Sequence, residues 1–167
     1  MMFDKKTEED TASWFGNVDK GQLLLSTRAF SASPLNTRQC RAILSRLLYL
    51  VAVQADPNPA TKLTHTEATD LFFATTKLFQ SRDILLRRTM HLLLKELVPM
   101  TDSAIIIVSS LTKDLTSNVE TYRSNAIRLL SRIGDAQLLT QIDRFMRSGL
   151  VDKDAAVSSA ALVSGLH

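Results

Sequence analysis

The side chains that most often do chemistry in proteins are few in this sequence and stand far apart. The histidines are His65, His91 and His167, and the single cysteine is Cys40. Metal or nucleophilic sites need such residues at fixed spacing, and the chain has no CxxC, no HExxH and no Gly-rich phosphate loop. We therefore predict no enzyme activity, no metal site and no cofactor. His91 and Cys40 fall in apolar helical patterns, where we expect a core or groove histidine and a buried thiol.

The polar residues with the most informative spacing are Ser81, Asp83 and Arg87. Ser81 is a good N-cap, because its hydroxyl can accept a hydrogen bond from a first-turn amide. Asp83 puts negative charge near the same helix start, and Arg87 can meet it one turn later. The pattern predicts a tight corner between two helices. Arg88 and the later Arg123 share this setting, so we expect all five residues to make structural contacts between helix pairs.

The composition favours long helices with a packed core. Of the 167 residues, 45% are hydrophobic and 22% are charged, while the chain has only 5 Gly and 4 Pro. A formal net charge of +3 does not by itself indicate nucleic-acid binding. No apolar run approaches the roughly 20 residues that span a bilayer, and the start is not a secretory signal. These features predict a soluble, cytosolic protein.

Cap and turn residues divide the chain into a tail and eight helices. Residues 1–18 are polar and aperiodic, which predicts a flexible tail whose Trp14 and Phe15 dock on the first helices or on a partner. Residues 19–167 form the helical trunk. The expected helices cover 20–30, 36–54, 64–79, 81–97, 101–115, 118–133, 135–149 and 152–167.

The helix starts carry specific expectations. Asn36 is the expected N-cap of the second helix. Thr64 or Thr66 opens the third, and Thr64 would form a capping box with Glu67. Thr101 or Asp102 caps the fifth. Helix 81–97 is apolar nearly all round, so we expect it to be buried between its neighbours.

Similar features recur with a period typical of paired-helix repeats. Arg123 follows Arg87 by 36 residues, and Met90, Leu93 and Leu94 align with Ala126, Leu129 and Leu130. A period of about 35–40 residues with two helices per unit indicates an α-solenoid of the HEAT or armadillo kind. The last helix is still apolar at its end, so we expect the solenoid to be truncated at the C-terminus, where another repeat would cover it.

Several longer motifs resemble the adaptin-like N-terminal trunk of coatomer gamma subunits over roughly residues 35–167. They are the stretches 66–81, 86–88, 109–114, 122–123, 151–153 and 157–164. The resemblance implies a right-handed, all-α solenoid of the adaptin N-terminal type and a non-enzymatic scaffold of the COPI vesicle coat, in Golgi-to-ER and intra-Golgi transport. It further implies binding to the zeta, beta and delta coatomer subunits and to Arf-GTP, and a cytoplasmic protein held peripherally on Golgi membranes by its partners. We expect no binding to nucleic acid.

Helix 101–115 offers a candidate partner surface. A core stripe through Ala104, Ile107, Val108, Leu111 and Leu115 has helical spacing, which leaves Ile105 and Ile106 well off its centre. These two are either covered by a neighbouring helix pair or exposed. The exposed alternative gives an apolar patch of Ile105, Val108, Ser109 and Thr112, suited to a protein partner. Because the corresponding helix of adaptin-like trunks contributes to Arf binding, the resemblance favours Ile105 and Val108 as Arf contacts.

A second hypothesis uses the arginines. A basic helical-repeat module could bind nucleic acid or an acidic protein surface through Arg38, Arg41, Arg46, Arg82, Arg87, Arg88, Arg123, Arg128 and Arg132. A phosphate track needs arginines in line on one face, with binding that falls steeply as the salt concentration rises. Here the arginines are spread over several helices and interleaved with acids.

Overall fold

A computed structural model describes residues 19–52, 62–133 and 136–165, and all regular structure in these segments is helical. The predicted tail, with Trp14 and Phe15, lies outside the described residues. Short 3-10 turns extend several helices, namely η1 (Thr27–Ser31), η3 (Lys77–Gln80), η4 (Val98–Met100) and η5 (Ala104–Ile107). The eight α-helices of the described segments are α2 (Lys20–Ser26), α3 (Thr37–Ala52), α4 (His65–Thr76), α5 (Ile84–Leu97), α6 (Val108–Leu115), α7 (Glu120–Ile133), α8 (Ala136–Leu150) and α9 (Ala155–Ser164).

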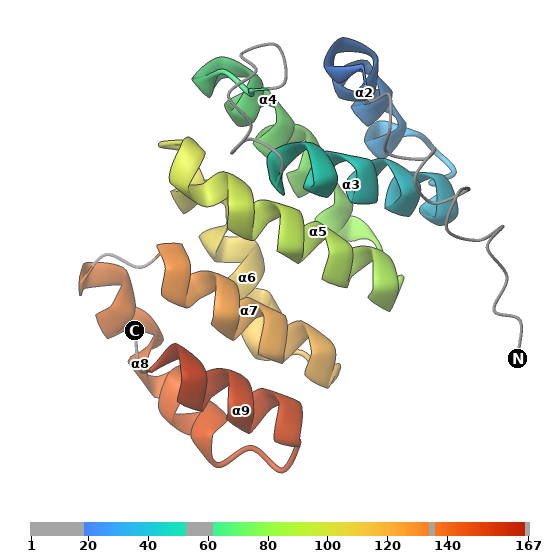
Figure 1. Ribbon diagram of the computed structural model, residues 1–167. Helices are drawn as coiled ribbons and strands as arrows, with labels where there is room; N and C mark the ends of the chain where they lie inside the picture. The colour runs from blue at the N-terminus through green and yellow to red at the C-terminus, as the bar shows by residue number, and fades with distance from the viewer. Residues whose placement is uncertain (1–18, 53–61, 134–135, 166–167) are drawn as a thin grey trace, which may run out of the picture.

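The helices stack as pairs in two layers. Helices α3, α5, α7 and α9 lie side by side in one layer, each in contact with the next (Figure 1). Their partners α2, α4, α6 and α8 form the second layer, and each precedes its partner in sequence and packs against it. This arrangement confirms the predicted all-α fold of repeated helix pairs.

Local capping explains where several helices begin, as predicted. The Thr64 hydroxyl accepts the Glu67 N–H at 3.2 Å, and the Glu67 carboxylate accepts the Thr64 N–H at 2.8 Å. This capping box satisfies two amides that the first turn leaves without helical partners. The Asn36 side chain likewise accepts the Gln39 N–H at 3.0 Å at the start of α3. The cap predictions for Thr64 and Asn36 are confirmed.

Other helix starts differ from the prediction by two residues. The N-cap of α5 is Asp83, whose side chain accepts the Leu86 N–H at 2.7 Å. Ser81 instead ends the preceding 3-10 turn, and its hydroxyl accepts the Asp83 N–H at 3.2 Å. At α9 the cap is Asp154, while Asp152 accepts the Asp154 N–H at 2.9 Å. Both corners therefore use two capping side chains in succession.

Two further boundaries differ from the prediction for packing or turn reasons. The predicted helix 101–115 starts as the 3-10 turn η5 and becomes α-helical only at Val108. The Thr101 hydroxyl, just before this turn, accepts the Ser103 N–H at 3.2 Å. Gly149 was expected to end its helix, but α8 continues through it to Leu150. A Cβ at Gly149 would lie 3.1 Å from Ala161 Cβ, so this glycine permits close packing of α8 on α9.

One continuous apolar core runs between the two layers, and Leu86, Met90, Leu93, Leu94 and Leu97 give it the inner face of α5. Helix α5 lies between its neighbours α3 and α7, as expected, but one of its faces stays open to solvent. Ile84, Leu85 and Leu92 are exposed, because α3 and α7 flank α5 on two sides and leave its outward face open.

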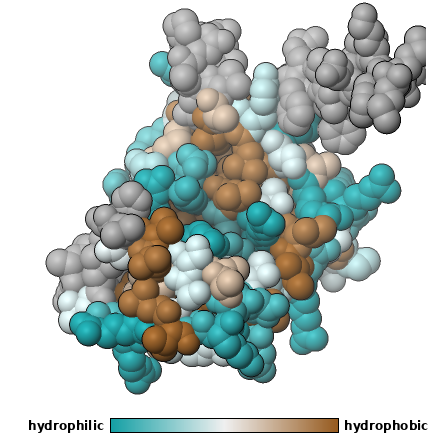
Figure 2. All heavy atoms as spheres, turned by 60° about the horizontal axis from the view of Figure 1, so that its bottom comes forward, coloured by the Kyte–Doolittle hydropathy of each residue, from teal (hydrophilic) through white to brown (hydrophobic). Residues whose placement is uncertain are grey.

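The α8–α9 end of the stack also carries exposed apolar side chains. Leu162 and Val163 of α9 and Val151 after α8 are exposed. Figure 2 brings this end of the molecule forward and shows apolar side chains gathered in bands among polar ones.

Candidate functional site

Arg87 lies in the first turn of α5, just after the corner that joins α4 to α5. Its side chain is almost fully buried, donates to the Phe79 carbonyl, and forms an ion pair with Asp114. The guanidinium carbon lies 4.9 Å from the ring centroid of Phe79 and 4.5 Å from that of Tyr122. The side chain of Asp83 is used instead as the N-cap of α5, so the expected meeting of Asp83 with Arg87 is wrong.

His91 completes this buried polar cluster. Its Nδ1 lies 2.6 Å from the Arg87 carbonyl oxygen, and because a carbonyl can only accept, Nδ1 is the donor. Its Nε2 lies 3.7 Å from the Asp114 carboxylate, and its ring packs edge-on against Phe79. His91 thus lies in the core. Its one hydrogen bond stays within α5, and its Nε2, which has no hydrogen-bond partner in the described segments, faces Asp114 of α6.

Arg123 repeats the arrangement one helix pair later. Its Nε and Nη2 each lie 3.2 Å from a carboxylate oxygen of Asp152, and its Nη1 donates to the Ser117 carbonyl at 2.9 Å. Two parallel bonds between a guanidinium and a carboxylate fix both distance and orientation. The pKa of Asp152 is held below its usual range, first by the Asp154 N–H and then by Arg123.

The corner residues thus differ in their surroundings. Arg87 and Arg123 each reach a preceding carbonyl and a later carboxylate, whereas Arg88 is exposed and makes no hydrogen bond or ion pair within the described segments. That all five residues, Ser81, Asp83, Arg87, Arg88 and Arg123, hold the repeats together stays a prediction.

The candidate partner patch lies on η5 and α6. Ile105 is 63% exposed, and Ile106 and Ser109 are exposed as well. Thr112 is half-buried and donates to the Val108 carbonyl at 2.8 Å, while Val108 packs partly on the core. The structure thus shows Ile105 and Ile106 open to solvent, which is the second of the two alternatives from the sequence. The assignment of a partner to this patch stays a prediction.

Metal and thiol chemistry find no support in the described segments. They hold no group of three His, Cys, Asp or Glu residues able to bind a metal ion. Cys40 is fully buried, and burial raises the pKa of its thiol, which disfavours the reactive thiolate. Among the helices described, none is both long and apolar enough to cross a bilayer.

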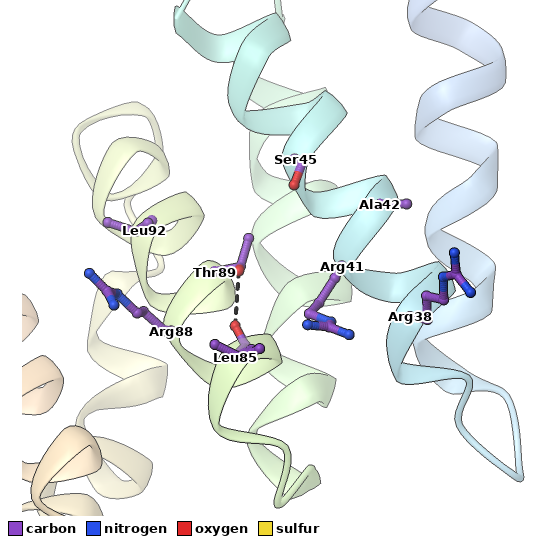
Figure 3. A pocket seen from close by; sticks show the side chains of 8 residues that line it. All are labelled: Arg38, Arg41, Ala42, Ser45, Leu85, Arg88, Thr89 and Leu92. Atoms are coloured by element: carbon purple, nitrogen blue, oxygen red, sulfur yellow. Dashed lines mark hydrogen bonds between the residues drawn. The ribbon is translucent and has the colours of Figure 1, made fainter. Parts of the chain in front are cut away.

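Sequence reasoning missed one surface feature, an open groove between α3 and α5. Its lining combines Arg38 and Arg41 of α3 with Arg88 and two leucines, Leu85 and Leu92, of α5 (Figure 3). The lining residues on α5 follow those on α3 by a constant 47 residues, as in Arg41 and Arg88. A search of the sequence for polar and apolar residues that repeat at this spacing on the outer faces of the two helices could have found the groove.

Comparison with known proteins gives the family. The family model described as the adaptin N terminal region matches residues 24–167. The chain is 50% identical over 163 residues to coatomer subunit gamma of Dictyostelium discoideum, which covers 98% of this chain and 18% of that protein. It is 47% identical over 167 residues to coatomer subunit gamma-1 of Oryza sativa subsp. japonica, covering 100% and 18%. With coatomer subunit gamma-1 of Bos taurus it shares 44% identity over 167 residues, covering 99% and 18%.

The chain therefore spans less than a fifth of the length of these relatives. Both the match over residues 24–167 and the stacked helix pairs point to the same conclusion. The chain belongs to the adaptin N-terminal family.

Proposed function

We propose that the chain is part of a non-enzymatic scaffold subunit of the COPI vesicle coat, acting in Golgi-to-ER and intra-Golgi transport. The observation that carries this proposal is 42–50% identity to coatomer gamma subunits along nearly the whole chain. The fold supports the proposal, since stacked helix pairs expose a long surface with separate places for several partners.

The partners in this proposal are the zeta, beta and delta coatomer subunits and a GTP-bound Arf. The chain is cytoplasmic and reaches Golgi membranes through these partners. The side chain of Ile105 supports η5 and α6 as the Arf contact, because a large aliphatic group that is 63% exposed loses contact with water when a partner covers it. Ser109 lies one turn further along the same face and offers a hydroxyl beside that apolar group.

A binding assay tests the Arf contact. The chain is co-expressed with a zeta subunit and mixed with GTP-locked Arf, and complexes are separated by size-exclusion chromatography. We expect Ile105→Asp with Ser109→Arg to weaken Arf binding at least about tenfold, or ~1.4 kcal/mol. Val108 is left unchanged, because its side chain packs partly on the core and an aspartate there would disturb folding.

The matched control is Leu25→Asp on α2, where the leucine is 58% exposed and lies far along the stack. This variant should bind Arf as tightly as the unmodified chain. Equal binding by the Ile105 and Ser109 variant, with an unchanged circular dichroism spectrum, would overturn the Arf assignment. Failure of the unmodified chain to bind the zeta subunit would count against the coat proposal itself.

A further inference from the structure

The groove between α3 and α5 combines positive charge with exposed apolar side chains. It has a volume of about 560 Å³ and lies on the layer opposite η5 and α6. Figure 3 shows Arg41 directed into the space between the two helices, while Arg38 and Arg88 extend outward along the two rims of the groove. The groove therefore has one arginine at its centre and one at each rim.

The positive charge of these three arginines is not balanced by acids within the groove lining. None of the residues lining the groove is Asp or Glu, and α3 contains no acid over its whole length. Arg38, Arg41 and Arg88 make no hydrogen bond or ion pair within the described segments, and Arg41 Nε is buried without a hydrogen-bond partner there. By contrast, Arg87, Arg123 and Arg147 each have a carboxylate partner.

The buried Arg41 Nε is the costly group in the absence of a ligand, because a buried N–H without an acceptor loses its hydration. Arg38 and Arg88 are exposed and add positive charge at the rims. Each planar guanidinium can bind one carboxylate through two parallel hydrogen bonds. The groove is therefore complementary to carboxylates presented at intervals along a segment.

Leu85 and Leu92 narrow the class of ligand. They are 56% and 49% exposed and lie about two turns apart on the same face of α5. A ligand that used only phosphates would leave both leucines in water. No aromatic side chain lines the groove, so stacking of nucleic-acid bases, which single-strand binding commonly uses, has no platform.

We infer that this groove binds an acidic amphipathic protein segment, in which Asp or Glu side chains pair with Arg38, Arg41 and Arg88 while leucine-type side chains cover Leu85 and Leu92. The inference goes beyond the coat function and does not rest on it, because it uses a different layer of the stack. Charge complementarity, together with the exposed leucines, selects this occupant.

Fluorescence anisotropy with a defined peptide tests the inference. The probe is a labelled helical peptide of about 16 residues built from Glu, Leu and Ala, long enough to run ~24 Å along α3 and α5. We expect saturable binding that weakens as the salt concentration rises. Arg38→Glu with Arg88→Glu should weaken binding at least about tenfold, and Leu85→Ser with Leu92→Ser should weaken it severalfold. A peptide with Lys in place of Glu should bind the unmodified chain much more weakly.

The matched control is Arg28→Glu with Arg82→Glu, which makes the same change in net charge at two exposed positions outside the groove. It should weaken binding no more than about twofold. Circular dichroism checks the fold of each variant. If the charge-reversal variant unfolds, the neutral variant Arg38→Gln with Arg88→Gln replaces it in the binding assay.

Three outcomes would overturn the inference. The first is no saturable binding of the acidic peptide by the unmodified chain, and the second is equal binding by the groove and control variants. The third is arginine-dependent binding of vesicles containing phosphatidylserine, or of a single-stranded oligonucleotide, by a chain that fails to bind the peptide.

Discussion

Arg87 on α5 and Asp114 on α6 form an ion pair that is buried between successive helix pairs. Their side chains are only 4% and 12% exposed. A buried pair often adds little net stability, because both charges give up their hydration to form it. Removal of one partner is different, since the other charge then stays buried without compensation.

Asp114→Ala should therefore destabilise the chain strongly. We expect a loss of about 3–5 kcal/mol in the free energy of unfolding, measured by urea titration. The double variant Arg87→Met with Asp114→Ala should lose less than the sum of the single changes, because it leaves no unpaired guanidinium. A loss under about 1 kcal/mol for Asp114→Ala would contradict the role given to this pair.

The equivalent pair of Arg123 and Asp152 should be weaker. Its side chains are 17% and 18% exposed, so water screens the charges more effectively. A double-mutant cycle with Arg123→Ala and Asp152→Ala should give a coupling free energy of the same sign as the Arg87–Asp114 cycle but smaller. A larger coupling free energy for Arg123 with Asp152 than for Arg87 with Asp114 would show that burial does not decide which ion pair is stronger.

Acid should weaken the chain through Asp152 and Glu67. The pKa of Asp152 is lowered by the Asp154 N–H and Arg123, and that of Glu67 by the Thr64 N–H and Lys20. A folded-state pKa below the unfolded value contributes stability above the unfolded pKa, near 4, and that stability is lost as the pH falls through the folded pKa. The urea midpoint of the unmodified chain should fall below about pH 4. In the double variant Asp152→Asn with Glu67→Gln, the urea midpoint should depend less steeply on pH. The same dependence on pH as in the unmodified chain would contradict the prediction.

The capping box at α4 can be tested with two threonines that are nearly adjacent. Thr64→Ala should destabilise the chain by about 1 kcal/mol, because it leaves the Glu67 N–H without its acceptor. Thr66 is exposed in the first turn and makes no hydrogen bond through its side chain within the described segments. Thr66→Ala is therefore the control and should lie within about 0.5 kcal/mol of the unmodified chain in thermal unfolding.

Gly149 lets α8 pack closely on α7 and α9. A Cβ there would lie 3.1 Å from Ala161 Cβ and 3.1 Å from Ile127 Cδ1. Alanine gains roughly 1 kcal/mol in helix propensity over glycine, but we expect the steric cost to exceed this gain, so Gly149→Ala should lower the melting temperature. Ile127→Val removes the Cδ1 atom and should relieve part of the cost in the double variant. A higher melting temperature for Gly149→Ala alone would show that the neighbours adjust freely.

Features set by neighbouring residues in the chain could be predicted from the sequence. The capping box of Thr64 and Glu67 and the cap at Asn36 depend on side chains within three residues of the amides they bind. The corner at Ser81 and Asp83 was harder, because both side chains can cap a helix and the backbone between them decides which one does.

Features set by distant residues could not be predicted in this way. Asp114, the partner of Arg87, is 27 residues away along the chain. The exposure of Leu85 and Leu92 depends on how α3 and α7 flank α5, although the sequence of α5 is apolar on most sides. At the candidate Arf patch, the sequence placed Ile105 off the core stripe, but only the packing of neighbouring helices shows that it is open to solvent.

The two arginine corners also bear on how the chain deforms. Arg87 and Arg123 both lie near the first turn of their helices, so their ion pairs fall along one edge of the stack. The ion pairs hold the helix pairs together along that edge. We expect the array to flex by fanning apart at the opposite edge, so that its curvature can adapt while the order of the helix pairs stays fixed.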